Sequence, residues 1–375
     1  MSISSDIREY ALSLGYDRVG FTTAERFTLL EQALSERPQM YSWAMDGSLQ
    51  LLKSADPGNI MPGARSIVVT VYDYSKQSYP KALAGKIGRV YLAYGAGALH
   101  AVHRARHSLL REFLVKLGAR VARGSISPPA RLAGARAGVT DFGKNCFAFA
   151  RDIGSFIVIN TLVTDIDLQY DEPALEVGCP DKCTLCLDTC PTGALYQPLR
   201  MNPLRCVAYN SYATPGTVFG NVSDILSPEI REGMGSWVYG CDICQEVCPR
   251  NQPRLKARLP SNAYLEHIAG DFALDRLLNM SDEHFRGRVL PLLQYIGDRR
   301  YFQRNAAVAL GNLRNEDAIP AITQAIQGPD ALVRGHAAWA LGKIGTGKAR
   351  VILNRCLLRE GSSFVRDEIR AALAR

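Results

Sequence analysis

The sequence lacks both a membrane segment and an export signal. No apolar run reaches about eighteen residues, the minimum for a helix that spans a bilayer. The first residues contain neither a basic region followed by a hydrophobic one nor a twin-arginine pair. We therefore expect a cytoplasmic protein without a membrane partner.

Acidic side chains are missing from one long stretch. No Asp or Glu occurs between Glu112 and Asp141. No carboxyl group in this stretch can therefore serve as a general acid.

The overall composition is that of a globular protein. The chain has 375 residues, 47% of them hydrophobic and 21% charged, with a formal net charge of +8. This length predicts two or three domains with ordinary cores. The positive charge is compatible with a polyanionic partner such as RNA, although many basic proteins bind no nucleic acid.

Cysteine is concentrated in one segment. Eight of the ten cysteines lie in the segment from Cys179 to Cys248: seven in two runs that each end in Cys-Pro, and Cys206 between the runs. The spacing C-x2-C-x3-C-P is typical of proteins that bind two 4Fe-4S clusters, in which the cysteine before proline ligates the other cluster. We predict that Cys179, Cys183, Cys186 and Cys248 hold one cluster, and that Cys190, Cys206, Cys241 and Cys244 hold the other.

One ligand in this scheme departs from the usual spacing. Three residues, not two, separate Cys179 from Cys183, and Pro180 occupies the expected position. Zinc also binds paired C-x2-C motifs, but it does not explain eight thiols and two Cys-Pro endings. Disulfides are disfavoured because nothing at the N-terminus indicates secretion.

The first 170 residues alternate between predicted helices and strands, which indicates an α/β domain. We expect a helix over residues 4–14, capped by Ser4 or Ser5 and stopped by Gly15, and a long helix from about residue 95 to Leu117. The expected strands are 18–22, 66–72 and 155–163, of which the second is nearly all apolar and hence buried on both faces.

The C-terminal part repeats itself. Arg304-Asn-Ala-Ala-Val-Ala-Leu310-Gly and Arg334-Gly-His-Ala-Ala-Trp-Ala-Leu341-Gly are each read as an apolar helix that ends in glycine, with an antiparallel helix between them. This pattern predicts HEAT-like helical repeats. Only about two repeats fit, so the tail must dock on the rest of the protein. Its basic residues form either a nucleic-acid surface or a solvated helix face: Arg299, Arg300, Arg304, Arg314, Arg334 and Lys343.

The order of these parts resembles the epoxyqueuosine reductase family, whose core is related to the reductive dehalogenases. The similarity covers most of the chain. It is carried by Gly143-Lys-Asn-Cys146, Cys186-Leu-Asp-Thr-Cys-Pro-Thr-Gly-Ala-Leu195, Arg205-Cys-Val-Ala-Tyr209, Tyr239-Gly-Cys-Asp-Ile-Cys-Gln-Glu-Val-Cys-Pro249 and the repeat residues 334–344. The domains predicted with it are a cobalamin-binding α/β reductase domain (1–172), a ferredoxin-like double 4Fe-4S domain (173–255), a helical connector (256–295) and HEAT-like repeats (296–375).

The resemblance implies an oxidoreductase that reduces epoxyqueuosine to queuosine in tRNA. Electrons would come from an external low-potential donor and pass through the two clusters to cobalamin. The resemblance points to His100, Gly143, Lys144, Asn145 and Cys146 as cobalamin-binding residues, and to the strand 155–163 as a source of backbone groups for the corrin. From the residues alone, His100 could equally be a helix-start histidine, and Cys146 could be a small residue that only lines the pocket.

One departure affects the chemistry. The family has a proton-donating Asp where this sequence has Gly124, within the stretch without acids. Another group, such as Asp141 or one of Tyr72, Tyr74, Tyr91 and Tyr94, could replace that acid. Alternatively, the same cofactors could act on a different small molecule, as in the reductive dehalogenases, or the chain could be a two-cluster electron carrier.

The ligand scheme makes a direct prediction. We expect Cys190→Ala or Cys244→Ala to remove the iron of one cluster, about four of about eight atoms per chain, and to destabilise the segment. Iron analysis of the two anaerobically purified variants checks this. Full iron in both would contradict the assignment.

Overall fold

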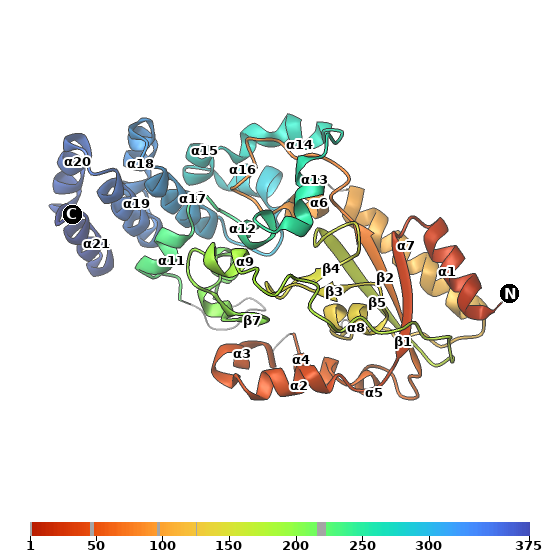
Figure 1. Cartoon of the computed structure of the whole chain (residues 1–375). Helices are drawn as coiled ribbons and strands as arrows, with labels where there is room; N and C mark the ends of the chain where they lie inside the picture. The colour runs from red at the N-terminus through yellow and green to blue at the C-terminus, as the bar shows by residue number, and fades with distance from the viewer. Residues whose placement is uncertain (1, 46–48, 96–97, 125, 216–222) are drawn as a thin grey trace.

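The molecule is elongated, and its three regions follow one another along its length. A computed structural model of the chain describes residues 2–45, 49–95, 98–124, 126–215 and 223–375, without the side chains of residues 94, 95 and 98–100. Figure 1 shows a sheet with its helices at the N-terminal end, the cysteine-bearing segment in the middle and a stack of helices at the C-terminal end. Among the described residues, no helix is both long and apolar enough to cross a bilayer.

A three-stranded sheet forms the centre of the N-terminal region. Its strands are β1 (Arg18–Thr23), β2 (Ser66–Asp73) and β5 (Ile157–Thr164), in the order β1-β2-β5. Both pairings are antiparallel. The three predicted strands are confirmed, and β2 is the central, buried one as its apolar sequence indicates. The strand β5 lies at the edge and leaves part of its backbone free for other partners.

Helices cover this sheet, and the first of them begins earlier than the sequence suggests. Ser2, not Ser4 or Ser5, caps α1, because its hydroxyl accepts the Ser5 amide at 3.2 Å. Ile7 and Ala11 of α1 pack with Leu110 and Leu114 of α7. The helices of this region are α1 (Ile3–Ser13), α2 (Thr28–Ser35), α3 (Pro38–Met45), α4 (Leu51–Ser54), α5 (Pro57–Ile60), α6 (Arg89–Gly95), α7 (Ala98–Lys116) and α8 (Ala130–Arg136).

The cysteine-bearing segment contains only short elements. A small hairpin, β3 (Asp141–Phe142) and β4 (Ala148–Phe149), precedes it and contacts it. The segment itself comprises α9 (Leu185–Asp188), β6 (Leu195–Gln197), β7 (Arg200–Met201), η1 (Pro203–Arg205), α10 (Val207–Tyr212), α11 (Pro228–Gly233), α12 (Ile243–Glu246), η2 (Pro249–Asn251) and α13 (Gln252–Lys256).

The C-terminal region, from residue 263 onward, is helical. It comprises α14 (Ala263–Ile268), η3 (Ala269–Phe272), α15 (Leu274–Leu278), α16 (Asp282–His284), the π-helical turn η4 (Phe285–Val289), α17 (Arg299–Leu313), η5 (Glu316–Ala318), α18 (Ile319–Ile326), α19 (Ala331–Ile344), α20 (Gly347–Leu357) and α21 (Ser363–Leu373).

The repeated glycines do not end their helices, contrary to the sequence interpretation. The helices α17 and α19 continue past Gly311 and Gly342 to Leu313 and Ile344. A Cβ at Gly311 would lie 2.8 Å from the Ala340 Cα, and one at Gly342 would lie 2.6 Å from the Ala372 Cβ. These glycines therefore allow successive repeat helices to approach closely.

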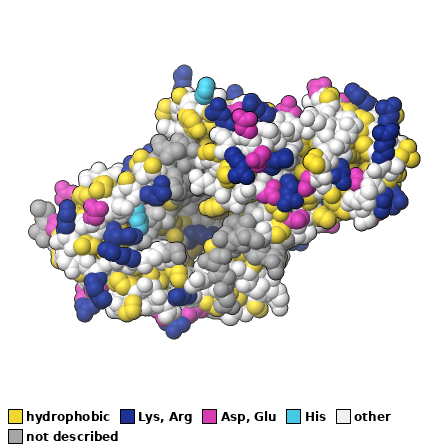
Figure 2. All heavy atoms as spheres, turned by 180° about the vertical axis from the view of Figure 1, so that it is seen from behind, with side chains coloured by type: hydrophobic (Ala, Val, Ile, Leu, Met, Phe, Trp, Pro, Cys, Tyr) yellow, Lys and Arg dark blue, Asp and Glu magenta, His cyan; other side chains and the backbone are white. Residues whose placement is uncertain are grey.

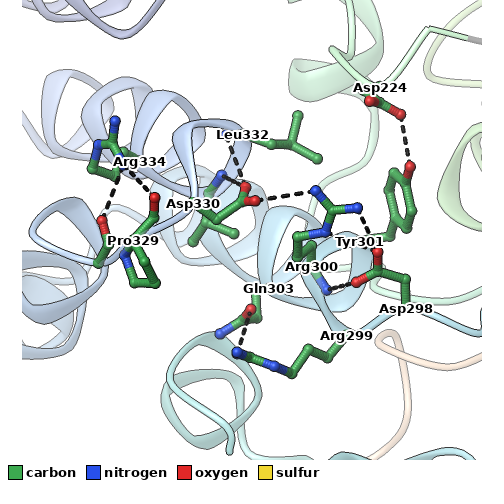
Figure 3. Close-up of polar contacts among 12 residues, drawn as sticks. Asp224, Asp298, Arg299, Arg300, Tyr301, Gln303, Pro329, Asp330, Leu332 and Arg334 are labelled. Atoms are coloured by element: carbon green, nitrogen blue, oxygen red, sulfur yellow. Dashed lines mark hydrogen bonds and ion pairs between the residues drawn. The ribbon is translucent and has the colours of Figure 1, made fainter. Parts of the chain in front are cut away.

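Buried polar side chains dock the repeats on the cysteine-bearing segment. Arg304, which is 0% exposed, donates to the carbonyls of Asn210 and Asp224, and Asn305 donates to those of Ser211 and Val238. The Tyr301 hydroxyl bonds Asp224 in the same interface, as Figure 3 shows. These bonds provide partners for backbone carbonyls that lie between Cys206 and Cys241. Helix α17 therefore supports the cysteine-bearing segment as well as the repeats.

An ion pair connects the cysteine-bearing segment to α21, the last helix of the repeats. The guanidinium of Arg231 in α11 donates twice to Glu368 of α21, each time at 2.7 Å. Only 3% of the Arg231 side chain and 17% of the Glu368 side chain are exposed. Removing either partner would leave a buried charge without its counter-ion.

We expect Glu368→Ala to lower the free energy of unfolding by about 3 kcal/mol for that reason. The control is Asp367→Ala, which removes the neighbouring carboxylate from an exposed pair with Arg370 and should change little. Urea unfolding of the two variants compares them. Equal destabilisation by both would show that the buried ion pair does not dock the repeats.

Candidate functional site

The structure brings the eight predicted cysteine ligands together in the two expected groups. The electrostatic neighbours of the Cys186 thiol are Cys179, Cys248 and Cys183. Those of the Cys244 thiol are Cys241, Cys206 and Cys190. We name the first set, Cys179, Cys183, Cys186 and Cys248, quartet 1, and the second set, Cys190, Cys206, Cys241 and Cys244, quartet 2.

Burial is the largest influence on the pKa of the Cys186 and Cys244 thiols. It raises the pKa of Cys186 to about 11 and that of Cys244 well above its ordinary value, and the neighbouring thiols add to both shifts. Within the described ranges, no three or more His, Cys, Asp or Glu side chains are arranged to hold a single metal ion. The assignment of the quartets as cluster ligands thus stays a prediction.

A cavity of about 510 Å³ adjoins quartet 2. All four cysteines of quartet 2 line it, whereas no cysteine of quartet 1 is among its described lining residues. The lining also includes residues 157–159 of the edge strand β5, the hairpin residues 145–148 and the start of α8. The volume is in the range of small-molecule sites. The cavity lining therefore combines the four thiols of quartet 2 with apolar residues of strand β5.

The residues predicted to bind a cofactor separate into three groups. Asn145 and Cys146 line the cavity. Gly143 and Lys144 are not among its described lining residues, and Lys144 instead contacts the loop of quartet 1. His100 lies in the first turn of α7, where its side chain is outside the described part of the structure.

The turn of the β3–β4 hairpin explains why Asn145 and Cys146 reach the cavity. The Gly143 amide bonds the Phe147 carbonyl, and Cys146 adopts a left-handed conformation with φ of 66°. A Cβ at Gly143 would lie 2.3 Å from the Phe149 ring and 2.7 Å from the Asn145 Oδ1. Only glycine fits at this position without displacement of its neighbours.

Asp141, the candidate acid of the sequence analysis, is not among the described residues that line the cavity. Both of its oxygens accept from the guanidinium of Arg250, at 2.6 and 2.7 Å. Arg250 follows the Cys248-Pro249 ending of quartet 1 and lies over the Phe149 ring. This ion pair connects Asp141 to the ending of quartet 1.

Two of the four candidate tyrosines reach the cavity. Tyr74 and Tyr91 line it, and burial raises the pKa of Tyr91 well above its ordinary value. Tyr72 packs against His103 instead, with ring centroids 5.2 Å apart. The side chain of Tyr94 is outside the described part of the structure.

Gly124 lies in a separate small recess of about 40 Å³, lined by His107, Arg111, Arg123 and Thr161 among others. Its φ is 138°, and a Cβ there would meet no atom within 4 Å. Burial, followed by the charge of Arg111, lowers the pKa of His107. The recess therefore has basic side chains where the related family has a carboxylic acid.

A buried network that the sequence did not indicate ties the strand to quartet 2. The Ser155 amide donates to Asn251 Oδ1 at 2.8 Å, and the Ser155 hydroxyl lies 2.9 Å from the Gln245 Oε1. Asn251 also donates to the Gln245 carbonyl at 2.8 Å. Gln245 directly follows Cys244, so this network fixes the cysteine loop relative to β5. Ser155 and Asn251 are 96 positions apart in the sequence, so no local sequence pattern could have predicted this network.

Most of the basic residues predicted for the tail are engaged within the protein. Arg300 pairs with Asp298 and Asp330, and Arg334 bonds Glu360 and the Pro329 carbonyl, contacts that Figure 3 shows in part. Lys343 pairs with Glu232, Arg299 bonds Gln303 and Arg304 is buried. The prediction that these six side chains present a charged surface is wrong for Arg304, which is buried. Of the six, which all lie in the described part of the chain, only Arg314 is exposed and makes no such bond.

Two family models match parts of the chain. Residues 179–251 match a 4Fe-4S double cluster binding domain, and residues 289–374 match HEAT repeats. The chain thus contains a region similar to double-cluster iron–sulfur domains, followed by a tail similar to HEAT repeats.

Full-length similarity is more specific. The epoxyqueuosine reductase of Bacillus subtilis (strain 168) is 29% identical over 98% of this chain and 94% of its own length. A solved epoxyqueuosine reductase with an epoxyqueuosine-modified tRNA-Tyr stem loop matches with 28% identity and a TM-score of 0.79, over 99% of this chain and 97% of the other. The Bacillus subtilis enzyme was also solved with its aspartate-bearing catalytic loop swung out of the active site, and it matches with 27% identity and a TM-score of 0.78, over 99% and 98% of the two chains.

These findings confirm the resemblance to the epoxyqueuosine reductase family over the whole chain. They also confirm the expectation of an oxidoreductase.

The turn that carries the predicted cofactor residues can be tested directly. We expect Gly143→Ala to destabilise the protein by about 1–3 kcal/mol, because the new methyl group overlaps Phe149 and Asn145. Gly270→Ala is the control, since a Cβ there meets no atom within 4 Å. Thermal and urea unfolding measure both. An unchanged Gly143→Ala variant would show that the tight turn is not required.

Proposed function

We propose that this protein is a cobalamin- and iron–sulfur-dependent reductase that converts epoxyqueuosine to queuosine in tRNA. The observation that carries the proposal is the cavity, because all four cysteines of quartet 2 form one of its walls and strand β5 forms another. A cofactor in this cavity would lie next to one cluster site. The full-length similarity to epoxyqueuosine reductases supports the substrate.

The residues around the cavity suit a large, flat ring with amide groups at its rim. Small side chains at Ala130, Ala148, Ala194 and Ala208 leave room along the walls. The edge strand β5 can offer backbone donors and acceptors, and the Asn145 carboxamide lies on the same wall. Bound cobalamin would supply a low-potential cobalt centre, and the clusters held by the quartets would supply one-electron carriers.

The protein's own contribution is to exclude water and to hold a proton near the reacting atoms. Ile157, Val158 and Ile159 give the cavity an apolar wall. Tyr74 and Tyr91, from the earlier candidate set, and the buried carboxyl of Asp242 line the cavity. With glycine at position 124, a proton-bearing side chain of this lining would have to protonate the leaving oxygen.

A tRNA partner requires basic side chains that are not already paired. Helix α20 has no acidic residue, and Lys348 and Arg355 on it are exposed, as is Arg359 just beyond it. Figure 2 shows Lys and Arg side chains gathered at this outer end of the repeats. We propose that this end contributes phosphate contacts.

The recess around Gly124 favours a second candidate function. Its two arginines, Arg111 and Arg123, would attract an anionic group of a small molecule and cannot donate a proton as a carboxylic acid does. The same cofactors would then act on a different substrate, as in a reductive-dehalogenase-like enzyme.

The deciding experiment uses the full chain, purified without oxygen and reconstituted with iron, sulfide and cobalamin. We expect about eight iron atoms and about one cobalt per chain. An epoxyqueuosine-containing tRNA stem loop and a low-potential reductant should then yield queuosine, with RNA binding that weakens steeply as salt rises. Cobalt without tRNA binding would favour the small-molecule reductase, and iron without cobalt would leave a two-cluster electron carrier.

The cofactor position is tested by filling the cavity. We expect Ala130→Trp to lower the cobalt content by about tenfold, because the indole would occupy space at the start of α8 that the ligand needs, with iron unchanged. Ala257→Trp, at an exposed position outside the cavity lining, serves as the control. Normal cobalt in the Ala130→Trp protein would place the cofactor elsewhere.

A further inference from the structure

The loop that begins quartet 1 has one residue more than the usual motif, and the β3–β4 hairpin runs directly beside it. The Phe142 amide donates to the Glu176 carbonyl at 3.2 Å, and the Gly178 amide donates to the Phe142 carbonyl at 2.9 Å. The next contact in this series is from the Lys144 amide to the Cys179 Sγ, at 3.4 Å. The hairpin thus fixes the chain up to Cys179 and bonds its sulfur.

The side chain of Lys144 then closes the loop. Its ammonium group lies 2.9 Å from the Pro180 carbonyl oxygen, 2.7 Å from that of Asp181 and 3.1 Å from that of Cys183. An ammonium group has three N–H donors and no acceptor. All three donors are therefore used by one loop, and Lys144 has none left for a ligand in the cavity.

The extra residue explains why such a clamp is needed. In a C-x2-C loop the short turn itself sets the direction of the two thiols, whereas an inserted residue allows the first thiol to turn away. Three carbonyls that converge on one charge can restrict the longer loop to a single conformation, because charge-assisted hydrogen bonds are stronger than neutral ones.

We propose that Lys144 is a positioning residue of the first cluster site: its clamp on the Cys179–Cys183 loop makes Cys179 a ligand in place of a cysteine at position 180. This inference rests on the proposed function in so far as quartet 1 holds a cluster.

The neighbouring residue has the corresponding contact with the other quartet. Asn145 is buried and donates from Nδ2 to the Cys244 carbonyl at 3.0 Å. One turn of the hairpin therefore bonds both cysteine loops through consecutive side chains. The effects of Lys144 and Asn145 substitutions should consequently differ in which cluster they disturb.

The test compares variants of the full, anaerobically reconstituted protein by iron content and by electron paramagnetic resonance of the reduced clusters. We expect Lys144→Met to lower the iron from about eight to about four atoms per chain and to remove one cluster's signal. Lys144→Arg should restore part of the loss, because the guanidinium keeps the charge and the donors. Cys179→Ala should resemble Lys144→Met, and the two changes together should cost no further iron.

The matched control is Lys182→Met, which removes an equal charge from the same loop. Within the described ranges, the exposed Lys182 side chain has no hydrogen bond or ion pair. It should retain about eight iron atoms. The paired change Cys179→Ala/Pro180→Cys restores the usual spacing, and we expect its iron content to be insensitive to Lys144→Met.

Several results would overturn the proposal. Lys144→Met with the iron and spectrum of the parent protein would show that no clamp is needed, and an equal loss in Lys182→Met would show that only charge matters. Loss of both clusters in Lys144→Met, or dependence on Lys144 in the protein with restored spacing, would reduce Lys144 to a general structural role. If the parent protein itself held no clusters, the proposed function would fail as well, so the two failures are distinguishable.

Discussion

The cysteine loops depend on hydrogen bonds from side chains of other elements to their backbone carbonyls. These loops contain only short helices and strands, so their own backbone bonds cannot fix eight thiols in space. Asn145 donates to Cys244, Asn251 to Gln245, and Lys144 to the loop between Cys179 and Cys183. The carbonyls bonded by Asn145 and Asn251 are buried or partly buried, and a buried carbonyl without a partner costs free energy, so these two bonds favour one loop conformation over others.

The repeat helices take part in the same arrangement. Arg304 and Asn305 of α17 bind carbonyls at the end of α10, which begins just after Cys206, and near the start of the Cys241 loop. The tail therefore supports quartet 2 in addition to any role in RNA binding. Arg304 is buried in this docking, and Arg300 and Arg334 pair with carboxylates of the repeats themselves. Exposed basic side chains remain on α20 and at the outer end of the repeats.

The cavity and the Gly124 recess are separate, and they bear on different parts of the proposed function. The cavity joins quartet 2 to the edge of the sheet and supports the cofactor proposal. The recess is small and basic, and it holds no carboxyl group among its described lining residues. The proposal for the cofactor therefore rests on the cavity, whereas the choice of substrate depends on the recess. A different substrate would not require different cluster and cofactor sites.

The sequence determined the elements whose patterns are local. The three strands follow from runs of apolar β-branched residues, the repeats from recurring alanine-rich segments, and the division of the cysteines from the spacing of C-x2-C and Cys-Pro. It was less informative where function depends on distant partners. Lys144 and Asp141 were predicted as cofactor and acid residues from the chain alone, and it could not show their contacts with the cysteine loops, 36 to 109 positions away.

The repeated glycines show the same division on a smaller scale. Their recurrence was visible in the sequence, yet only the packing of α17, α19 and α21 shows that they allow close helix contact instead of ending a helix. The sequence by itself thus determined which residues can form each element and which thiols belong together, because those preferences act over a few neighbouring residues. Only the tertiary structure decided which polar side chains hold the loops and which line the cavity, because hydrogen bonds between distant segments leave no periodic trace in the chain.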